Sequence, residues 1–263
     1  MKLVTQKAPK RNGEPRTDSA EWRMRVELAA AHRIAHHHGL SEGIFNHLTC
    51  AVPGKTDRYL QIPFGLHWSE ITASCFLEVS YDGKILKGEG EAERSCYCIH
   101  APIHRLIPEA VCVMHTHMPH ASALSRLDDP RIKPIGQTEC GLLDHVVYDE
   151  QYTGPAFDPK EGERLAGVLG HKKKAMFMSN HGVLTVGKSV AEAYDVLYYL
   201  ERASQVQLYA MWTGQKLKPV PQPVVDLTIK TIGGPQYGGK PHWQHHFDAL
   251  RRMLDRREPE YKH

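Results

Sequence analysis

The chain has 263 residues, 41% of them hydrophobic, and this length fits one large domain or two small ones. Lysine and arginine total 33 against 30 aspartates and glutamates, so the charge balance indicates neither a nucleic-acid nor a membrane partner. The N-terminus lacks the apolar run of a signal peptide, and no stretch approaches the roughly 18 apolar residues of a membrane span. We therefore expect a cytoplasmic protein whose six cysteines are reduced.

The first half of the chain predicts helices and short strands after a polar start. Residues 1–18 contain Pro and Gly and predict a flexible N-terminal arm. A helix follows, capped by Asp18 or Ser19 and ended by Gly39, because apolar residues recur at helical spacing between them. HLTCAVP and RYLQIP indicate strands, SEITASCFLEVS suggests a short helix, and the Asp-Gly pair of YDGKIL indicates a hairpin turn. CYCIHAPIHRLI predicts a helix ended by Pro108, and VCVMHTH predicts a short buried strand.

The second half alternates irregular stretches with strong helix signals. A helix over SALSRL leads into a long irregular region, about residues 128–160, rich in Gly, Pro and Asp. KEGERLAGVLG indicates a helix closed by Gly170, and AMFMSN and VLTVG indicate strands. Ser189 can cap a long helix over VAEAYDVLYYLERASQVQLYAMW, whose broad apolar surface indicates a subunit interface. Residues 215–263 predict a C-terminal extension, with a linker followed by a short basic helix, FDALRRMLDRR.

Two histidines in VCVMHTH are candidate metal ligands. Residues two apart on a strand point to the same face, so His115 and His117 project together and can bind one ion. His181 lies in a Ser-Asn-His-Gly turn between two apolar runs, a poor place for core packing. The alternative interpretations are that His115 and His117 are strand histidines that face solvent, and that His181 is an ordinary turn histidine. Three histidines would leave a metal position open, as catalytic sites do.

Several motifs resemble those of a known superfamily. VCVMHTHMPHASALS and MFMSNHGVLTVG resemble the class II aldolase/adducin superfamily, whose zinc sites take an H-x-H pair and a later histidine in an N-H-G turn. SEGIFNHLTCAVPG is similar to its G-x-x-N/S-H turn, and LQIPFGLHWSEITAS to a segment of its adducin-type branch. The resemblance runs from about Glu21 to Gly214. It implies an α/β fold over residues 19–214, with three α/β/α layers around a central, largely antiparallel sheet, and commonly a homotetramer.

The chain also departs from the sugar-phosphate aldolases of that superfamily. Those enzymes place an acid/base glutamate in an S-S-E-like segment upstream of the H-x-H pair. Counting back without gaps puts Cys96 near that place, while Glu89, Glu91 and Glu93 need a slip of several residues. Segment 63–67, Pro-Phe-Gly-Leu-His, replaces the small-residue phosphate pocket. Both changes, which adducin-type members share, argue against ordinary phosphosugar cleavage.

A different acid/base residue is then needed if the protein is an enzyme. Glu139 follows the histidine pair on the irregular stretch and could ligate the metal or act as a base, or be a solvated loop carboxylate. Asn46 is placed like the family's turn asparagine, whose amide can bind an enolate or carboxylate oxygen, or it serves the turn alone. His100 and His104 share a helix face and could line the pocket, although a structural role is favoured. Cys96 and Cys98 are expected to pack in the core.

The expected function is that of a divalent-metal-dependent lyase. It would cleave a C–C bond of a hydroxy-carbonyl or carboxylated small molecule, by retro-aldol reaction or decarboxylation, through a metal-stabilised enolate. Zinc is the first expectation, with manganese and iron open because imidazole binds all three. The alternatives are a non-catalytic adducin-like interaction module and iron-dependent oxidative cleavage on the same fold.

Overall fold

One mixed sheet organises residues 19–232 and 237–263, which the computed structural model describes. Its strand order is β4-β3-β2-β1-β5-β8-β7-β6, and every neighbouring pair is antiparallel except β6 and β7. The prediction of a central, largely antiparallel sheet is confirmed. The expected N-terminal arm, residues 1–18, lies outside the described residues.

The elements alternate along the chain between short strands and helices. The strands are β1 (His47–Ala51), β2 (Arg58–Gln61), β3 (Leu77–Ser80), β4 (Ile85–Lys87), β5 (Cys112–Thr116), β6 (Val146–Asp149), β7 (Ala175–Met178) and β8 (Val183–Gly187). The helices are α1 (Ala20–His37), α2 (Arg94–Leu106), α3 (Pro119–Leu124), α4 (Gln137–Leu142), α5 (Pro159–Leu169), α6 (Val190–Trp212), α7 (Gln222–Ile232) and α8 (His242–Arg257). Short 3-10 turns occupy Trp68–Glu70, Tyr237–Gly239 and Pro259–Lys262.

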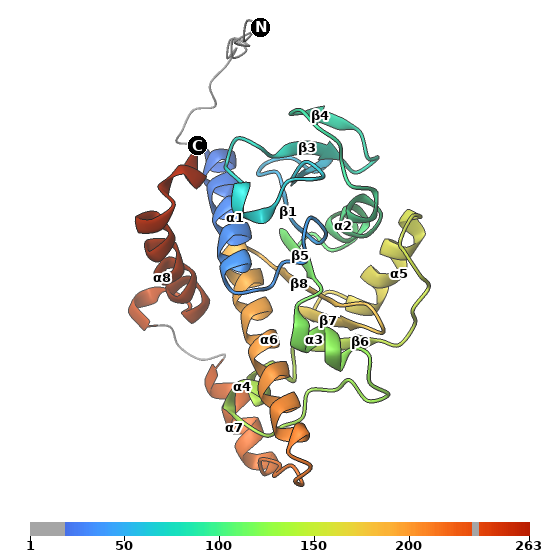
Figure 1. Ribbon diagram of the computed structural model, residues 1–263, viewed down its shortest axis with the longest axis vertical. Coiled ribbons are helices and arrows are strands. Elements are labelled where there is room, and N and C mark those ends of the chain that lie inside the picture. Colours follow the sequence, from blue (N-terminus) through green and yellow to red (C-terminus); the bar gives the residue numbers. More distant parts are fainter. Residues whose placement is uncertain (1–18, 233–236) are drawn as a thin grey trace, which may run out of the picture.

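Helices cover both faces of the sheet and make the three predicted layers (Figure 1). Helices α1 and α6 pack on one face with α8 outside them, and α2 and α5 pack on the other. Side chains alternate along β5, so the strand contributes to an apolar cluster on each face of the sheet. Cys112 and Met114 pack on the α1/α6 side, and Val113 packs on the α2/α5 side. Each layer is therefore held by a separate apolar cluster.

The helix ends follow the predicted caps. The Ser19 hydroxyl accepts the amide hydrogen of Trp22 at 3.0 Å, and the Ser189 hydroxyl accepts that of Glu192 at 3.1 Å. Gly170 follows α5 with φ +61°, a left-handed conformation that glycine adopts without strain. These three caps fix where α1, α6 and α5 begin or end.

Three sequence predictions need correction. No helix forms over SEITASCFLEVS beyond a single turn, and residues 77–80 form β3 because they pair with β2 in the sheet. The region 128–160 is only partly irregular, since it contains α4 and β6. The tail has two helices rather than one, because α7 precedes the predicted basic helix.

The C-terminal residues pack on the domain. The Arg33 guanidinium of α1 forms ion pairs with Glu258 and Glu260, each at 2.8 Å. The amide of Ala73 donates to the carbonyl of Tyr261 at 2.9 Å. The end of the chain thus closes over the outer face of α1.

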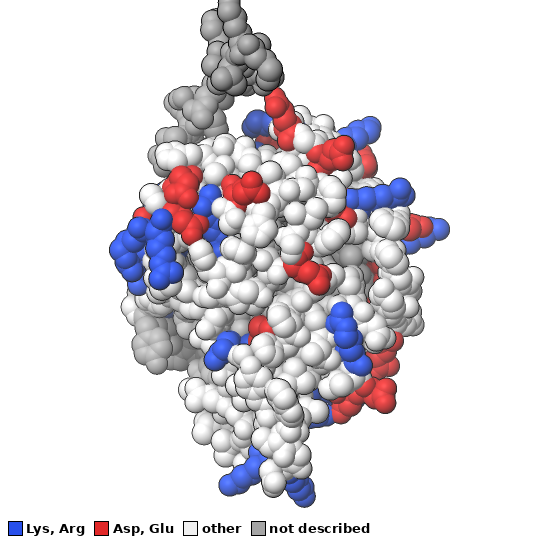
Figure 2. Space-filling model, in the orientation of Figure 1, with Lys and Arg blue, Asp and Glu red and all other residues white. Residues whose placement is uncertain are grey.

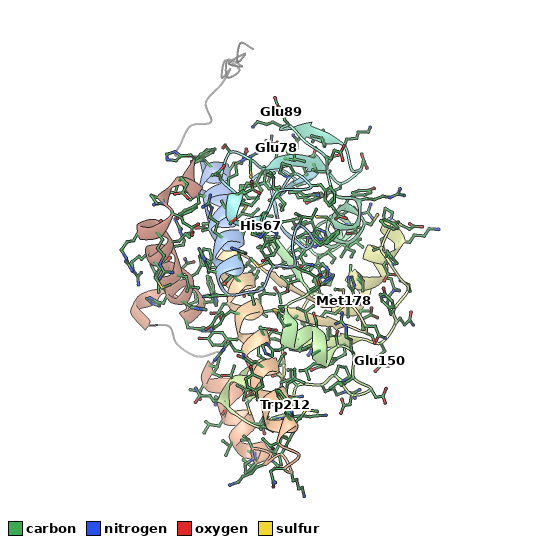
Figure 3. All side chains as sticks on the ribbon, viewed as in Figure 1. His67, Glu78, Glu89, Glu150, Met178 and Trp212 are labelled. Carbon is green, nitrogen blue, oxygen red and sulfur yellow. The ribbon has the colours of Figure 1, made fainter. Side chains whose placement is uncertain are left out.

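The far end of α6 exposes apolar side chains. Trp212, the last residue of α6, is 85% exposed and lies in the lower part of the molecule (Figure 3), and Val206, Tyr209 and Met211 of the same helix are also exposed. Figure 2 shows few charged side chains over this end of the molecule, apart from basic groups at its tip. No helix in residues 19–232 or 237–263 combines the length and apolarity needed to cross a membrane.

Candidate metal centre

The three candidate ligands meet where β5 ends and β8 begins. His115 is the fourth residue of β5 and pairs with Leu184 of β8, and His117 follows the strand by one residue. His181 lies in the turn that joins β7 to β8. Because β5 and β8 are antiparallel, the end of one strand lies beside the start of the other, and this brings His181 to the H-x-H pair.

The three rings surround a common point. The ring centroids lie 4.9 Å apart for His115 and His117, 4.8 Å for His115 and His181, and 4.9 Å for His117 and His181. One nitrogen of each ring lies within 4.8 Å of the other two. The Nε2 atoms of His115 and His117 are 3.1 Å apart. This arrangement is compatible with one metal ion held by three imidazoles.

Neighbouring groups fix how two of the rings are turned. Nδ1 of His115 donates its hydrogen to the carbonyl of Val183 at 2.9 Å, which leaves the Nε2 lone pair facing the centre. Nδ1 of His117 contacts the carboxylate of Glu42, which is largely exposed. Such partners on the outer nitrogen are typical of metal-binding histidines, because they set the tautomer and the ring orientation.

The centre favours neutral imidazoles. Burial, followed by the neighbouring histidines, lowers the pKa of His181 to about 4 and holds the pKa of His115 well below its ordinary value. Both rings are therefore unprotonated at neutral pH, as metal ligands must be.

Close packing shapes the turn beside the rings. A Cβ on Gly182 would lie 2.6 Å from the carbonyl oxygen of Thr116 and 2.7 Å from Cδ2 of His117, so only glycine fits there. Asn46 has φ +76°, and its Oδ1 accepts the amide hydrogen of His117 at 3.1 Å. In the part of the chain that the structure describes, its buried Nδ2 has no hydrogen-bond partner. The Asn46 amide is thus held at the centre with its donor group free.

The predicted catalytic residues occupy different places. Asn46 lies at the centre, as described above. Glu139 is on α4, which packs against α6 and α7, and it is 3% exposed rather than on a solvated loop. Its carboxylate lies close to Gly136 at the start of that helix. The structure brings together Asn46 and the three histidines, and it does not bring Glu139 into this group.

A small pocket opens beside the ring of His181. Met178, at the end of β7 and labelled in Figure 3, is one of its lining residues. Tyr152 also lines the pocket; it is 53% exposed, and its ring centroid lies 6.2 Å from that of His181. The remaining lining residues include Asp149, Gln151, Thr153, Glu161 and Ser179. Acidic, amide and hydroxyl groups therefore stand next to the candidate metal centre.

Two further residues lie next to the centre: His47, which was not a site candidate, and Glu93, which in the sequence lies several residues away from the family's acid/base position. His47 of β1 lies directly opposite His115 in the sheet, and their rings stack at 5.7 Å. Its Nε2 contacts the carboxylate of Glu93 at 2.6 Å. Burial raises the pKa of Glu93, but bonds to His47 and to the first amides of α2 outweigh it and lower that pKa to about 2. The sequence gives one signal for this contact, the position of Glu93 just before the predicted helix, where its carboxylate can cap the helix. It gives no signal for the strand pairing that places His47 opposite His115.

Comparisons with known proteins give relatives along nearly the whole chain. A Pseudomonas aeruginosa protein, provisionally named a class 2 aldolase, is 33% identical over 255 residues that cover 95% of each chain. Mouse alpha-adducin is 31% identical over 250 residues, 90% of this chain and 34% of adducin. A Streptomyces roseochromogenus protein named 4-hydroxy-3-prenylphenylpyruvate oxygenase/4-hydroxy-3-prenylbenzoate synthase is 31% identical over 217 residues, 81% of this chain and 76% of that one.

Solved structures agree with these relatives. An aldolase II superfamily protein from Pseudomonas syringae superposes with a TM-score of 0.86 at 34% identity, over 94% of this chain and 98% of that one. L-fuculose 1-phosphate aldolase from Glaciozyma antarctica PI12 gives 0.80 at 25% identity, over 96% of each chain. The sequence profile of the class II aldolase and adducin N-terminal domain matches residues 26–208, and the chain therefore belongs to the class II aldolase and adducin family.

Proposed function

We propose that this protein is a divalent-metal-dependent lyase that cleaves a C–C bond of a hydroxy-carbonyl or carboxylated small molecule, by retro-aldol reaction or decarboxylation. The observation that carries the proposal is the 3.1 Å approach of the His115 and His117 Nε2 atoms, with the His181 ring beside them. Two lone pairs at that distance repel unless a proton or a cation lies between them. A bound divalent ion would supply positive charge that polarises a substrate oxygen and stabilises the electron pair left by bond cleavage.

The donor set supports zinc as the first candidate, and manganese and iron as the next. Three neutral imidazoles add no negative charge, so an ion held by them keeps its full positive charge toward the substrate. Imidazole suits all three metals, and elemental analysis of the purified protein separates them.

Asn46 is proposed to bind the substrate. Its Oδ1 is occupied by the amide of His117, so the Nδ2 hydrogens are directed elsewhere. Within the described residues these hydrogens meet no acceptor, although the atom is buried. A carboxylate or enolate oxygen of a substrate would supply that acceptor.

Two exposed aromatic rings support an apolar or aromatic substrate. Phe45, the residue before Asn46, and Phe64 are both exposed, and their ring centroids lie 6.4 Å apart. Phe64 belongs to the segment that replaces the phosphate pocket of the sugar-phosphate aldolases. A paired aromatic surface favours a substrate with an apolar body over a phosphorylated sugar.

Proton transfer is proposed for Tyr152. Tyr152 lines the same pocket as His181 and is 53% exposed, and its hydroxyl would supply the proton that a leaving group needs. The acid/base assignment of Glu139 stays a prediction, and Glu139→Gln tests it against Tyr152→Phe. The residue whose loss abolishes turnover while metal content is unchanged is the acid/base group.

Oligomerisation is proposed to use the exposed end of α6. The apolar residues Val206, Tyr209, Met211 and Trp212 are exposed near the C-terminal end of α6, and a second copy of the chain would bury them. A homotetramer is the expected assembly, and sedimentation velocity measures it.

Two alternatives retain support. The alpha-adducin likeness supports a non-catalytic interaction module, and the oxygenase likeness supports iron-dependent oxidative cleavage. The oriented ligand rings and the free amide of Asn46 favour an enzyme over the module, because an interaction surface needs neither.

The deciding experiment pairs elemental analysis with an activity screen. Wild-type protein is expected to contain stoichiometric divalent metal and to cleave one member of a panel of hydroxy-carbonyl and aromatic carboxylate compounds. His117→Ala should abolish turnover and weaken metal binding while the fold remains, because the residue lies just beyond the end of β5. A stable protein that binds no metal at His115, His117 and His181 supports the adducin-like module, and oxygen consumption during turnover supports oxidative cleavage.

A further inference from the structure

A second group of metal-binding side chains lies between the sheet and α2. It consists of His47 on β1 and of Cys96 and His100 on α2, and one donor atom of each lies within 4.8 Å of the other two. Cys96 and His100 are fully buried, and His47 is 7% exposed. The group shares no ligand with the three-histidine centre.

The hydrogen bonds around His100 leave one of its nitrogens as a free lone pair. The carbonyl of Ala110 can only accept, so His104 donates to it from Nδ1 at 2.8 Å. Nε2 of the neutral His104 then accepts from the Thr49 hydroxyl at 2.8 Å. The Thr49 oxygen in turn accepts from Nδ1 of His100 at 2.8 Å, and the competing Val113 carbonyl is farther away, at 3.5 Å. Nε2 of His100 is therefore unprotonated.

A different set of hydrogen bonds leaves one nitrogen of His47 with a free lone pair as well. The Glu93 carboxylate accepts the amide hydrogens of Ser95 and Cys96, at 3.1 and 2.7 Å, so it acts as an acceptor throughout. Nε2 of His47 must then donate to Glu93 at 2.6 Å, and in the neutral imidazole that binds a metal Nδ1 keeps its lone pair. A carboxylate on the outer nitrogen of a histidine is a recurring arrangement around protein-bound metals.

Both lone pairs are left without hydrogen bonds. Among the described residues, neither Nδ1 of His47 nor Nε2 of His100 has a partner, and both atoms are buried. A buried nitrogen without a hydrogen-bond partner destabilises the fold, and such atoms are uncommon in native proteins. A cation bound by both lone pairs and the sulfur would remove this cost.

We propose that His47, Cys96 and His100 bind a second divalent metal ion, zinc by preference, that fixes α2 to the sheet. Two imidazole nitrogens and a thiolate form a donor set that suits zinc. On binding, the Cys96 thiol loses its proton to solvent and the sulfur forms a bond to the ion, so no oxidant or reductant is needed. The site shares no ligand with the centre proposed for the lyase activity, so metal binding at the two sites can be tested separately.

The proposed second site lies next to the three-histidine centre. His47 pairs with His115 across β1 and β5, and the two rings stack at 5.7 Å. A metal ion held by His47, Cys96 and His100 would fix β1 and the start of α2 next to His115. The second ion would thus support the three-histidine centre without contacting substrate.

Cobalt substitution tests the proposal, because only this site offers sulfur. Metal-free protein is titrated with Co²⁺, and the wild type is expected to bind two ions per chain with a sulfur-to-cobalt charge-transfer band in the near ultraviolet. Cys96→Ser should bind one ion and lose the band. The matched control, Cys98→Ser, removes another buried thiol of α2 and should keep both. His181→Ala should lower cobalt binding at the other centre and leave the band unchanged.

The wild-type spectrum alone can overturn the proposal. A wild-type protein that binds cobalt without the charge-transfer band refutes it, whatever the variants do. A band that persists in Cys96→Ser, or that is lost in Cys98→Ser instead, also refutes it. If Cys96→Ser fails to fold, His100→Gln replaces it and should bind one cobalt fewer. If the protein shows the charge-transfer band but has no lyase activity, the result contradicts the proposed function and leaves the second metal site supported.

Discussion

At the scale of single residues, spacing in the sequence predicts ligands when the backbone geometry is regular. The H-x-H pair was predicted to share a face because strand side chains alternate, and His115 and His117 do face one another. His47 and Glu93 could not be identified in the same way. Their contact depends on the register of β1 against β5 and on where α2 begins, and neither is encoded by local spacing.

Glu42 provides the sharpest prediction at this scale. Its carboxylate contacts Nδ1 of His117 and orients that ring, so Glu42→Gln should weaken metal binding at the three-histidine centre by about 10- to 100-fold. Stability should change by less than about 0.5 kcal/mol, because Glu42 is exposed.

Chelator competition measures this change in affinity. Glu163→Gln is the matched control, because Glu163 is also an exposed carboxylate in an ion pair, with Arg105 on α2. Equal metal affinity in Glu42→Gln and Glu163→Gln would show that the Glu42 contact does not orient the ligand.

At the scale of elements, caps and periodicity predicted most helices, and the failures have two causes, sheet pairing and flanking Pro and Gly residues. Ser19, Ser189 and Gly170 end helices where the sequence indicates. The segment over β3 combines residues that suit a helix with a position in the sheet, and pairing with β2 overrides the local preference. Helix α7 escaped prediction because Pro and Gly surround it on both sides.

Gly182 shows how one turn joins two elements. Gly182→Ala should destabilise the protein by about 1–3 kcal/mol, because the new Cβ would lie 2.6 Å from the Thr116 carbonyl oxygen, a backbone atom of β5 that cannot move alone. The same change should push the His117 ring, 2.7 Å away, and weaken metal binding.

Urea unfolding in the presence of a chelator isolates the effect on the fold. Gly167→Ala on α5 is the control, because Gly167 has open space around the new Cβ and should gain about 0.5–1 kcal/mol from helix propensity. A Gly182→Ala protein as stable as the wild type would mean that β5 and β8 can separate at this turn without cost.

At the scale of the whole molecule, buried histidines couple the fold to pH. Burial lowers the pKa of His32 and of His104 to about 4, whereas the same side chains in an unfolded chain titrate near 6.5. Between these values the unfolded chain binds protons that the folded chain does not, so the free energy of unfolding falls as pH falls. Glu93, with its pKa lowered to about 2, contributes stability that is fully present above about pH 4.3 and is lost as pH falls below that value.

His32 makes this dependence testable. From pH 7.5 to pH 5.0 the metal-free protein should lose about 2 kcal/mol of unfolding free energy through His32 alone. His32 packs against Trp68 and Phe76, and its Nε2 has no partner among the described residues, so a phenyl ring should fill its place. His32→Phe should therefore reduce the loss by that amount, as measured by urea unfolding at the two pH values. His171→Phe, at an exposed position, is the matched control for replacing an imidazole by a phenyl ring. Parallel pH profiles for wild type and His32→Phe would mean that His32 is protonated in the folded core, where the Leu28 carbonyl is its hydrogen-bond acceptor.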